Sequence, residues 1–478
     1  MIVAGTSCSI SEARNANVTP SQTSIPFIFT LPPTSQINPT PPFVAYPTST
    51  PPPTSYPTAQ TVSTNAVAFV ASDYGQGGLS SSSLWIANVD GSGERKLVDN
   101  INVPKWRPYG GYARLKWSPN RKWISYLSSD ELWLAAPDGS VNKKILSRDD
   151  ETTGVIWEYD WSPDSKQVAF IKTSVDKNGA PVGQDAGEDF AVGILDLESG
   201  VIKMLGEYQN LFVFMKWAPN GQYLILPNRG SYVIVNTSSG KVTTIKMKAQ
   251  PGYNSSIDVD LVTWSPNSQW FFQIHHGNGC AGMWSVVTTL DGMDYTVDAE
   301  SIHQSVPVWD NKGNYLYLRT TDDVPCWGPT VEPNVKLQRY NLTSHQLESL
   351  LSLNGTQGDE YSWSVSISPD DRILEAYTPM VTLENEQLFV ILDLDSMSVA
   401  KHAVNLGIIN QKPFDNNVKW SSDNQHLVIF SEEYQPQNSM HLNHGPFYTL
   451  DIHSGKTAII SGDHRVTDWA ASPAVTNP

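Results

Sequence analysis

The chain has 478 residues, a formal net charge of −17 and a sequence pI near 4.9. Such an acidic balance does not favour nucleic acid or an anionic membrane surface as a partner, while neutral and cationic partners stay open. The sequence contains no apolar run of about eighteen residues, so we expect no helix that crosses a bilayer. Abundant Trp, Gly and Pro with only 17% charged residues are typical of many short strands joined by turns.

Residues 1–8, MIVAGTSC, resemble the end of a bacterial lipoprotein signal, in which small residues precede the cysteine that receives lipid. The charged start and the apolar stretch of such a signal are missing, which a start site further upstream would explain. We therefore predict lipid attachment at Cys8, with a plain terminus and a free cysteine as the alternative. Any contact with a membrane would be made through this anchor alone.

Residues 9–64 are rich in Pro, Thr and Ser and show no hydrophobic period. This composition predicts an extended spacer with a reach on the order of 100 Å. A segment that carries O-linked sugars is another interpretation of the same composition. We expect the folded domain to span residues 65–473 and residues 474–478 to form a tail.

The folded part repeats one unit about every fifty residues, a period typical of propellers and solenoids. Its clearest copy, residues 159–172, reads YDWSPDSKQVAFIK: a strand ends in Trp161, a Ser-Pro-Asp turn follows, and a second strand begins. Proline presets the second turn position, Asp tolerates the third, and the serine oxygen can accept a backbone N–H. The tryptophan ring must be buried against a neighbouring copy, because one hairpin alone cannot cover it.

The copies follow one another down the chain. The first has strands at 66–72, 84–89 and 95–98 but lacks the strand with the Trp-Ser-Pro turn. In the next seven copies the position of the ring, here called the ring slot, is occupied in turn by Trp117, Trp161, Trp217, Trp264, Trp309, Ile367 and Trp420. The last segment, residues 466–473 (VTDWAASP), supplies the missing strand, with Ala471 in the ring slot and Trp469 on the same face.

These repeats predict an all-β chain that forms a single propeller of four-stranded blades, closed where the C-terminal strand joins the N-terminal blade. Counting that composite blade gives eight blades; seven is the alternative, should the seventh copy be irregular. The Trp-Ser-Pro-Asp hairpin, followed by an aliphatic-Asp-x-x-Gly hairpin, resembles TolB-type, WD-repeat-like β-propellers. It also resembles the propeller half of dipeptidyl peptidase IV-type enzymes. The Gly-x-Ser-x-Gly motif of their hydrolase domain is absent from this sequence.

Connections between the second and third strands differ in length from copy to copy, and long loops on one rim are where a rigid ring usually binds its ligand. They are short in the second and fourth copies. The long ones are Thr173 to Phe190, His275 to Gly282, Thr320 to Val335, Thr378 to Gln387 and Ser431 to Pro446. Tolerated surface insertions are the alternative explanation.

Cys280 and Cys326 lie in two of these connections, at equivalent places in adjacent copies. We predict a disulfide between them and hence an oxidising, extracytoplasmic compartment, with two unpaired thiols as the alternative. Histidines gather in the same connections, namely His275, His276, His441 and His444. They could hold a divalent metal over the channel, as ligands do in TolB-like oligogalacturonate lyases, although their spacing is not that of a tight metal site.

Aromatic and acidic residues in these loops and blade connections suit peptides and sugars alike. The candidate binding residues are Trp106, Tyr109, Trp157, Glu158, Tyr253, Trp327, Tyr361 and Tyr434. We therefore expect a monomeric, extracytoplasmic binding propeller without catalytic residues or a cofactor. Its partner would be a protein, or a cell-envelope polysaccharide or peptidoglycan, and not nucleic acid. The alternative is a metal-dependent polysaccharide lyase or hydrolase.

Overall fold

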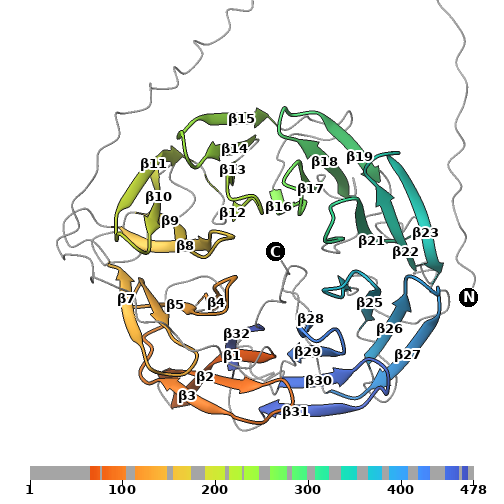
Figure 1. Ribbon diagram of the computed structural model, residues 1–478, viewed down its shortest axis with the longest axis horizontal. Helices are drawn as coiled ribbons and strands as arrows, with labels where there is room; N and C mark the ends of the chain where they lie inside the picture. Colours follow the sequence, from red (N-terminus) through yellow and green to blue (C-terminus); the bar gives the residue numbers. More distant parts are fainter. Residues whose placement is uncertain are drawn as a thin grey trace, which may run out of the picture. The chain divides into compact units, whose positions relative to one another are not determined.

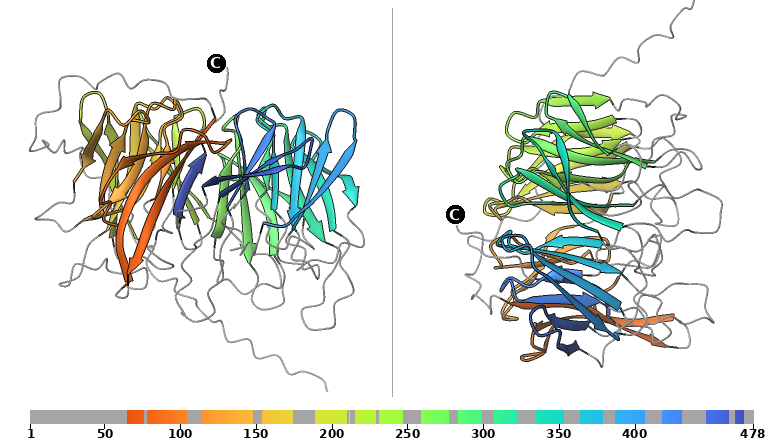
Figure 2. Two further views of the ribbon diagram at one scale, coloured as in Figure 1. Left: turned by 90° about the horizontal axis from the view of Figure 1, so that it is seen from below. Right: turned by 90° about the vertical axis from the view of Figure 1, so that its right-hand side faces the viewer.

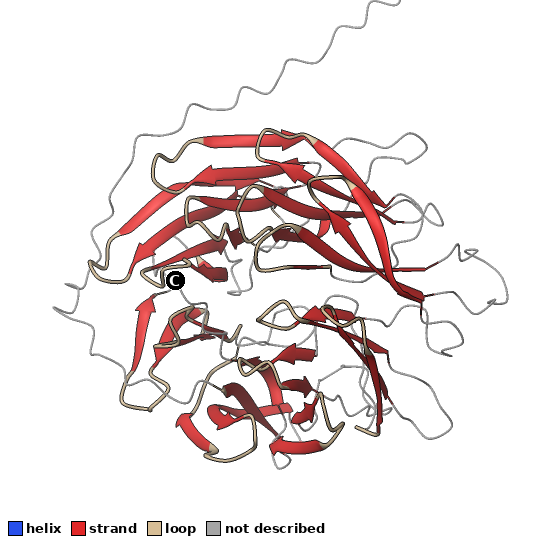
Figure 3. Cartoon of the chain, turned by 45° about the vertical axis from the view of Figure 1, so that its right-hand side comes forward, coloured by secondary structure: helices blue, strands red, loops and turns tan. Residues whose placement is uncertain are grey.

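A computed structural model of the chain describes most of the folded part. The described residues are 65–75, 78–103, 114–147, 154–173, 189–209, 211, 215–228, 231–246, 259–276, 283–298, 307–321, 335–352, 364–378, 387–406, 418–430, 447–461 and 466–471. Every regular element among them is a β-strand (Figure 3). None of these residues belongs to a helix long and apolar enough to span a membrane. The predictions for residues 1–64 and for the tail lie outside the described residues.

The described strands form eight four-stranded antiparallel sheets, which stand as blades around a ring (Figure 1). Blade 1 holds β1 (Ala66–Gly75), β2 (Gly78–Asn88), β3 (Arg95–Val98) and β32 (Val466–Ala471). Blade 2 holds β4 (Lys116–Trp117), β5 (Ile124–Ser128), β6 (Glu131–Ala135) and β7 (Asn142–Leu146). Blade 3 holds β8 (Val155–Trp161), β9 (Gln167–Thr173), β10 (Asp189–Asp196) and β11 (Ile202–Gln209). Blade 4 holds β12 (Lys216–Trp217), β13 (Tyr223–Asn228), β14 (Ser231–Asn236) and β15 (Val242–Lys246).

The second half of the ring repeats this pattern. Blade 5 holds β16 (Val259–Trp264), β17 (Trp270–His276), β18 (Met283–Thr289) and β19 (Asp294–Asp298). Blade 6 holds β20 (Val308–Trp309), β21 (Tyr315–Thr321), β22 (Val335–Asn341) and β23 (Gln346–Ser352). Blade 7 holds β24 (Ser364–Ile367), β25 (Ile373–Thr378), β26 (Gln387–Asp393) and β27 (Val399–Val404). Blade 8 holds β28 (Val418–Trp420), β29 (His426–Phe430), β30 (Phe447–Asp451) and β31 (Thr457–Ser461).

The predicted fold is confirmed, including the count of eight blades and the way in which the ring closes. The C-terminal strand β32 pairs antiparallel with β1, with Val67 opposite Ala471 and Phe69 opposite Trp469. The alternative of seven blades is wrong, because the seventh copy forms a regular sheet of β24 to β27 although Ile367 replaces the tryptophan in its ring slot.

Side-chain hydrogen bonds between blades 1 and 8 also stabilise the closure of the ring. Asn65, which directly precedes β1, donates from Nδ2 to Oδ2 of Asp423 at 3.0 Å, and its Oδ1 accepts from the hydroxyl of Ser422. Asp423 also receives a contact from Nδ1 of His426 at 2.8 Å. The start of the first blade is therefore fixed to the first hairpin turn of the last blade.

The Ser-Pro-Asp turn folds as its chemistry predicts. In blade 3 the Ser162 hydroxyl donates to Asp164 at 2.7 Å and accepts the backbone N–H of Gln167 at 2.8 Å, so the serine joins both ends of the turn. Ser165 takes the left-handed conformation, at φ 61°, and its hydroxyl accepts the backbone N–H of Asn120 from the turn of blade 2 at 2.9 Å. The turns of blades 2 and 3 are thus linked, and the backbone N–H of Asn220 donates to the hydroxyl of Ser268 at 2.9 Å to link those of blades 4 and 5 in the same way.

The core lies between the blades. One buried cluster contains Leu127 and Leu132 of blade 2 together with Tyr159, Trp161 and Phe170 of blade 3. The ring-slot indoles of five blades donate their N–H groups to the preceding blade: Trp117 to Ala470 O, Trp161 to Ser125 Oγ, Trp217 to Asp160 O, Trp264 to Lys216 O and Trp309 to Thr263 Oγ1. Each indole therefore packs against its neighbour and is also held in one orientation by a hydrogen bond.

The strands of the blades run between two ends of the ring (Figure 2). The connections at these two ends differ in length. Antiparallel order places the first and third connections of a blade at one end, and the second connection and the link to the next blade at the other. Second connections are short in blade 2, from Ser128 to Glu131, and in blade 4, from Asn228 to Ser231. They are longer from Thr173 to Asp189, His276 to Met283, Thr321 to Val335, Thr378 to Gln387 and Phe430 to Phe447. We call the end that carries them the long-connection face.

Candidate functional site

Most of the residues that the sequence singled out lie outside the described residues. These are Trp106, Tyr109, Tyr253, Trp327, Tyr361, Tyr434, Cys8, Cys280, Cys326, His441 and His444. His275 and His276 belong to β17, where they stand opposite Trp284 and Met283 of β18. Trp157 and Glu158 lie on β8 and are buried, at 9% and 3% exposure. Glu158 is therefore the candidate whose buried surroundings the structure describes. The binding roles of all these residues stay predictions.

Glu158 follows a break in the strand pairing. On β8, Ile156 pairs with Lys172 and Glu158 with Ile171, so Trp157 is an extra residue in a β-bulge. A bulge changes the direction in which the next side chain points and is common beside functional positions. Here it lies in an innermost strand, toward the long-connection end of blade 3.

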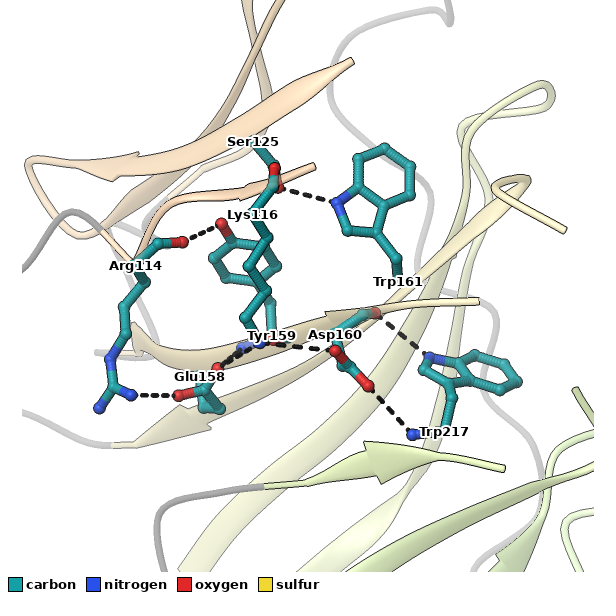
Figure 4. Close-up of polar contacts among 8 residues, drawn as sticks. All are labelled: Arg114, Lys116, Ser125, Glu158, Tyr159, Asp160, Trp161 and Trp217. Carbon is teal, nitrogen blue, oxygen red and sulfur yellow. Dashed lines mark hydrogen bonds and ion pairs between the residues drawn. The ribbon is translucent and has the colours of Figure 1, made fainter. Parts of the chain in front are cut away.

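Two cations of blade 2 contact the Glu158 carboxylate (Figure 4). Nη1 of Arg114 lies 2.8 Å from Oε2, and Nζ of Lys116 lies 2.9 Å from Oε1. Oε1 also accepts the backbone N–H of Tyr159 at 3.1 Å. Each oxygen of the Glu158 carboxylate therefore has a cationic partner. These ion pairs join blades 2 and 3 at the inner edge of the seam between them.

Lys116 is the centre of this cluster. Its ammonium donates to the carbonyl of Tyr159, lies 3.5 Å from Oδ1 of Asp160 and stands 4.9 Å from the centre of the Tyr159 ring. The Tyr159 hydroxyl in turn donates to the carbonyl of Arg114. All three donor directions of an ammonium group are therefore used, which fixes the lysine against β8.

Asp160 extends the cluster to a third blade. Its Oδ2 accepts the backbone N–H of Trp217 at 3.0 Å, and its carbonyl accepts the Trp217 indole N–H at 3.2 Å. Figure 4 shows Asp160 between Lys116 of blade 2 and Trp217 of blade 4. The inner-strand charge cluster, defined as Arg114, Lys116, Glu158 and Asp160, therefore ties together the innermost strands β4, β8 and β12.

The charges in this cluster stabilise each other against burial. Burial alone would raise the pKa of Glu158, but Arg114 and Lys116 outweigh it and lower that pKa to about 2. Burial would likewise lower the pKa of Lys116, but the carboxylates of Glu158 and Asp160 raise it instead. Glu158 is therefore ionised across the physiological pH range.

The inner-strand charge cluster is better suited to holding the blades in place than to acid–base catalysis. The pKa of Glu158 is lowered, away from the neutral range in which a general acid or base works best. Glu158 is 4% exposed in its side chain, whereas Arg114 is 38% exposed and Lys116 is 25% exposed, so solvent reaches the cations. Among the described residues no group of three or more His, Cys, Asp or Glu side chains is placed to hold a metal.

Comparisons with known proteins identify the fold. No family model matches the chain, and no curated protein matches it. Dihydro-heme d1 dehydrogenase NirN in complex with DHE matches with a TM-score of 0.51 and 13% identity over 86% of this chain and 76% of that one. The structure of a eukaryotic initiation factor matches with a TM-score of 0.50 and 11% identity over 86% of this chain and 100% of that one. The chain is a β-propeller.

TolB from Acinetobacter baumannii matches with a TM-score of 0.32 and 14% identity, over 71% of this chain and 80% of that one. Identities this low describe the fold alone. The resemblance to propellers that the repeats predicted is confirmed at that level by the eight blades.

Sequence reasoning missed three members of the charge cluster, namely Arg114, Lys116 and Asp160. A signal for two of them was present. Lys116 and Asp160 both stand directly before a ring slot, so they occupy the same repeat position in consecutive blades with opposite charge. Comparing that position between copies would have suggested an ion pair between Lys116 and the next blade. The sequence carries no comparable signal for Arg114 or for the bulge at Trp157.

Proposed function

We propose that this propeller is an extracytoplasmic, non-enzymatic binding module whose long-connection face takes a protein or a cell-envelope polymer. The observation that carries the proposal is the asymmetry of the connections. At one end of the ring short turns join the strands, as at Ser162 to Gln167, while five second connections at the other end are long. Chain length that a compact fold does not need is usually kept for recognition.

The described core supports a rigid platform for these connections. Hydrogen bonds link the turns of blades 2 and 3 and those of blades 4 and 5, and five ring-slot indoles donate to the preceding blade. The inner-strand charge cluster joins the innermost strands of blades 2, 3 and 4. A rigid scaffold lowers the entropy cost of binding, because fewer groups have to be ordered when the partner binds. The spacer composition of residues 9–64 and the cysteine at position 8 support a tethered location outside the cytoplasm.

A loop exchange in the full chain tests the proposal. Residues 174–188 and 431–446 are each replaced by Arg229-Gly230, the short second connection of blade 4. We expect the melting temperature to stay within a few degrees and the capture of the partner to fall at least about tenfold, since the contacts would be lost while the blades remain. Capture is measured by co-sedimentation with purified peptidoglycan and by cross-linked pull-down from a detergent-solubilised envelope, which distinguish a polymer from a protein.

The control variant is Met293→Ser, which changes an exposed residue in the third connection of blade 5, at the opposite end of the strands. Its capture should equal that of the wild type. Undiminished capture by the folded loop-exchange variant, or loss of capture in the control, would contradict the assignment of the binding face.

A further inference from the structure

The seam between blades 7 and 8 contains a buried carboxyl group and a buried indole N–H group. Glu375 on β25 is fully buried, at 0% exposure. Its Oε2 accepts the hydroxyl of Ser366 at 2.7 Å, while its Oε1 is buried without a hydrogen-bond partner among the described residues. The indole N–H of Trp420 on β28 is likewise buried without such a partner.

These two groups occupy positions that are joined by a hydrogen bond elsewhere in the ring. In blade 2, Ser125 stands opposite Lys116, and its hydroxyl accepts the indole N–H of Trp161 at 2.8 Å. In blade 7, Glu375 stands opposite Ser366 in the same register, and Trp420 is the ring-slot residue of the following blade. Glu375 and Trp420 are therefore the counterparts of Ser125 and Trp161.

The surroundings of the pair are apolar. The cluster at this seam consists of aliphatic and aromatic side chains from both blades, including Tyr377, Phe389, Ile391, Leu427 and Ile429, with Trp420 packed against it. Its only titratable members are Tyr377 of β25 and Tyr448 of β30. Burial and the Ser366 hydrogen bond are the influences on the pKa of Glu375, and no described charged side chain contributes. A negative charge on Glu375 would thus have no described cation nearby to balance it.

We propose that the seam between blades 7 and 8 is a pH-sensitive joint, which is closed while the Glu375 carboxyl group is neutral and loosens when that group ionises. A neutral carboxyl group keeps the Ser366 hydrogen bond at small cost, whereas a carboxylate in this apolar seam has to be hydrated or drives the blades apart. Ionisation releases the proton to solvent. The strands on either side of the seam, β25 and β29, end where two of the long connections begin. The joint therefore adjoins the long-connection face.

The direction of the pH effect follows from linkage. Burial raises the pKa of Glu375 to about 8, although the Ser366 hydrogen bond lowers it in part. Between about pH 4.5 and 8 the folded protein then holds a proton that the unfolded chain has released. The unfolding equilibrium constant should therefore rise about tenfold per pH unit across this window, so the joint is most stable in acid and weakens as the pH rises.

The test compares the wild-type full chain with Glu375→Gln, which keeps the size of the side chain and removes its ionisation. Unfolding by denaturant is measured at pH 5, 6.5 and 8. We expect the ratio of the two unfolding constants to change more than about a hundredfold across this range, in favour of the variant at high pH. Hydrogen exchange, compared at equal pH, should show faster exchange of β26 and β28 amides in the wild type than in the variant at pH 8.

Two further variants make the result specific. Glu348→Gln removes an exposed carboxylate of blade 6 and should follow the wild type at every pH. Glu375→Ser installs the residue that blade 2 has at this position, and it should also lose the pH dependence, even if Glu375→Gln folds poorly. A ratio that stays constant between pH 5 and 8 in both Glu375 variants would overturn the proposal.

Discussion

Replacing Glu158 with alanine is expected to lower the free energy of unfolding by about 3 kcal/mol. Removing one partner of a buried ion pair leaves the others with unbalanced charge, and here both Arg114 and Lys116 lose their contacts with a carboxylate that is 4% exposed. The value lies at the lower end of the range for such changes, because the side chains of Arg114 and Lys116 are 38% and 25% exposed and can be partly hydrated. Denaturant unfolding of the full chain measures it.

The matched control is Glu348→Ala in blade 6. Glu348 also forms an ion pair at 2.8 Å, with Nε of Arg339, but it is 57% exposed. Exposed pairs contribute little, so this change should cost less than about 1 kcal/mol. Equal losses in the two variants would show that burial of the inner-strand charge cluster adds nothing to its contribution.

The same carboxylate should make the protein sensitive to acid. Arg114 and Lys116 hold the pKa of Glu158 at about 2, below its ordinary value of 4.5. Because the folded-state pKa is the lower one, this contribution is complete above about pH 4.5 and is lost as the pH falls toward 2. The difference in unfolding free energy between wild type and Glu158→Gln should therefore shrink by about 3 kcal/mol between pH 5 and 2. A pH-independent difference would refute an ionised, paired Glu158.

The repeats predicted the fold because the same two turns recur in nearly every copy. A Trp-Ser-Pro turn and an Asp-x-x-Gly turn each fix a hairpin locally, and together they define four strands per unit. Even the missing strand of the first copy could be found at residues 466–473, and β32 does complete that blade. Local chemistry of this kind is readable without knowing which residues meet in space.

The seams could not be predicted in the same way. Lys116 and Glu158 lie far apart in the sequence, and Trp157 forms its bulge where no Gly or Pro marks an irregularity. The unusual position of Glu375 could be noticed in the sequence, since its carboxyl group interrupts the otherwise apolar stretch ILEAY. That Glu375 is the counterpart of Ser125, which accepts the ring-slot indole N–H of the next blade, follows only from comparing the register of one seam with that of another.

Trp161→Ala is expected to lower the free energy of unfolding by about 3–5 kcal/mol. The ring is 5% exposed and packs into the cluster shared by blades 2 and 3, so its removal leaves a cavity that the strands on either side can fill only in part. Ser125 loses the indole N–H at 2.8 Å but still donates to the carbonyl of Lys116 at 3.0 Å, so its hydroxyl is not left without a partner. The cavity is therefore the main cost.

Trp161→Phe separates the two contributions. Phenylalanine keeps most of the ring but has no N–H group, so the loss of the hydrogen bond alone should cost about 1 kcal/mol, with the remainder due to the smaller ring. Chemical denaturation of both variants gives the two values. A phenylalanine variant as unstable as the alanine variant would mean that the bond to Ser125 outweighs the packing, and that the indoles join the blades chiefly by hydrogen bonding.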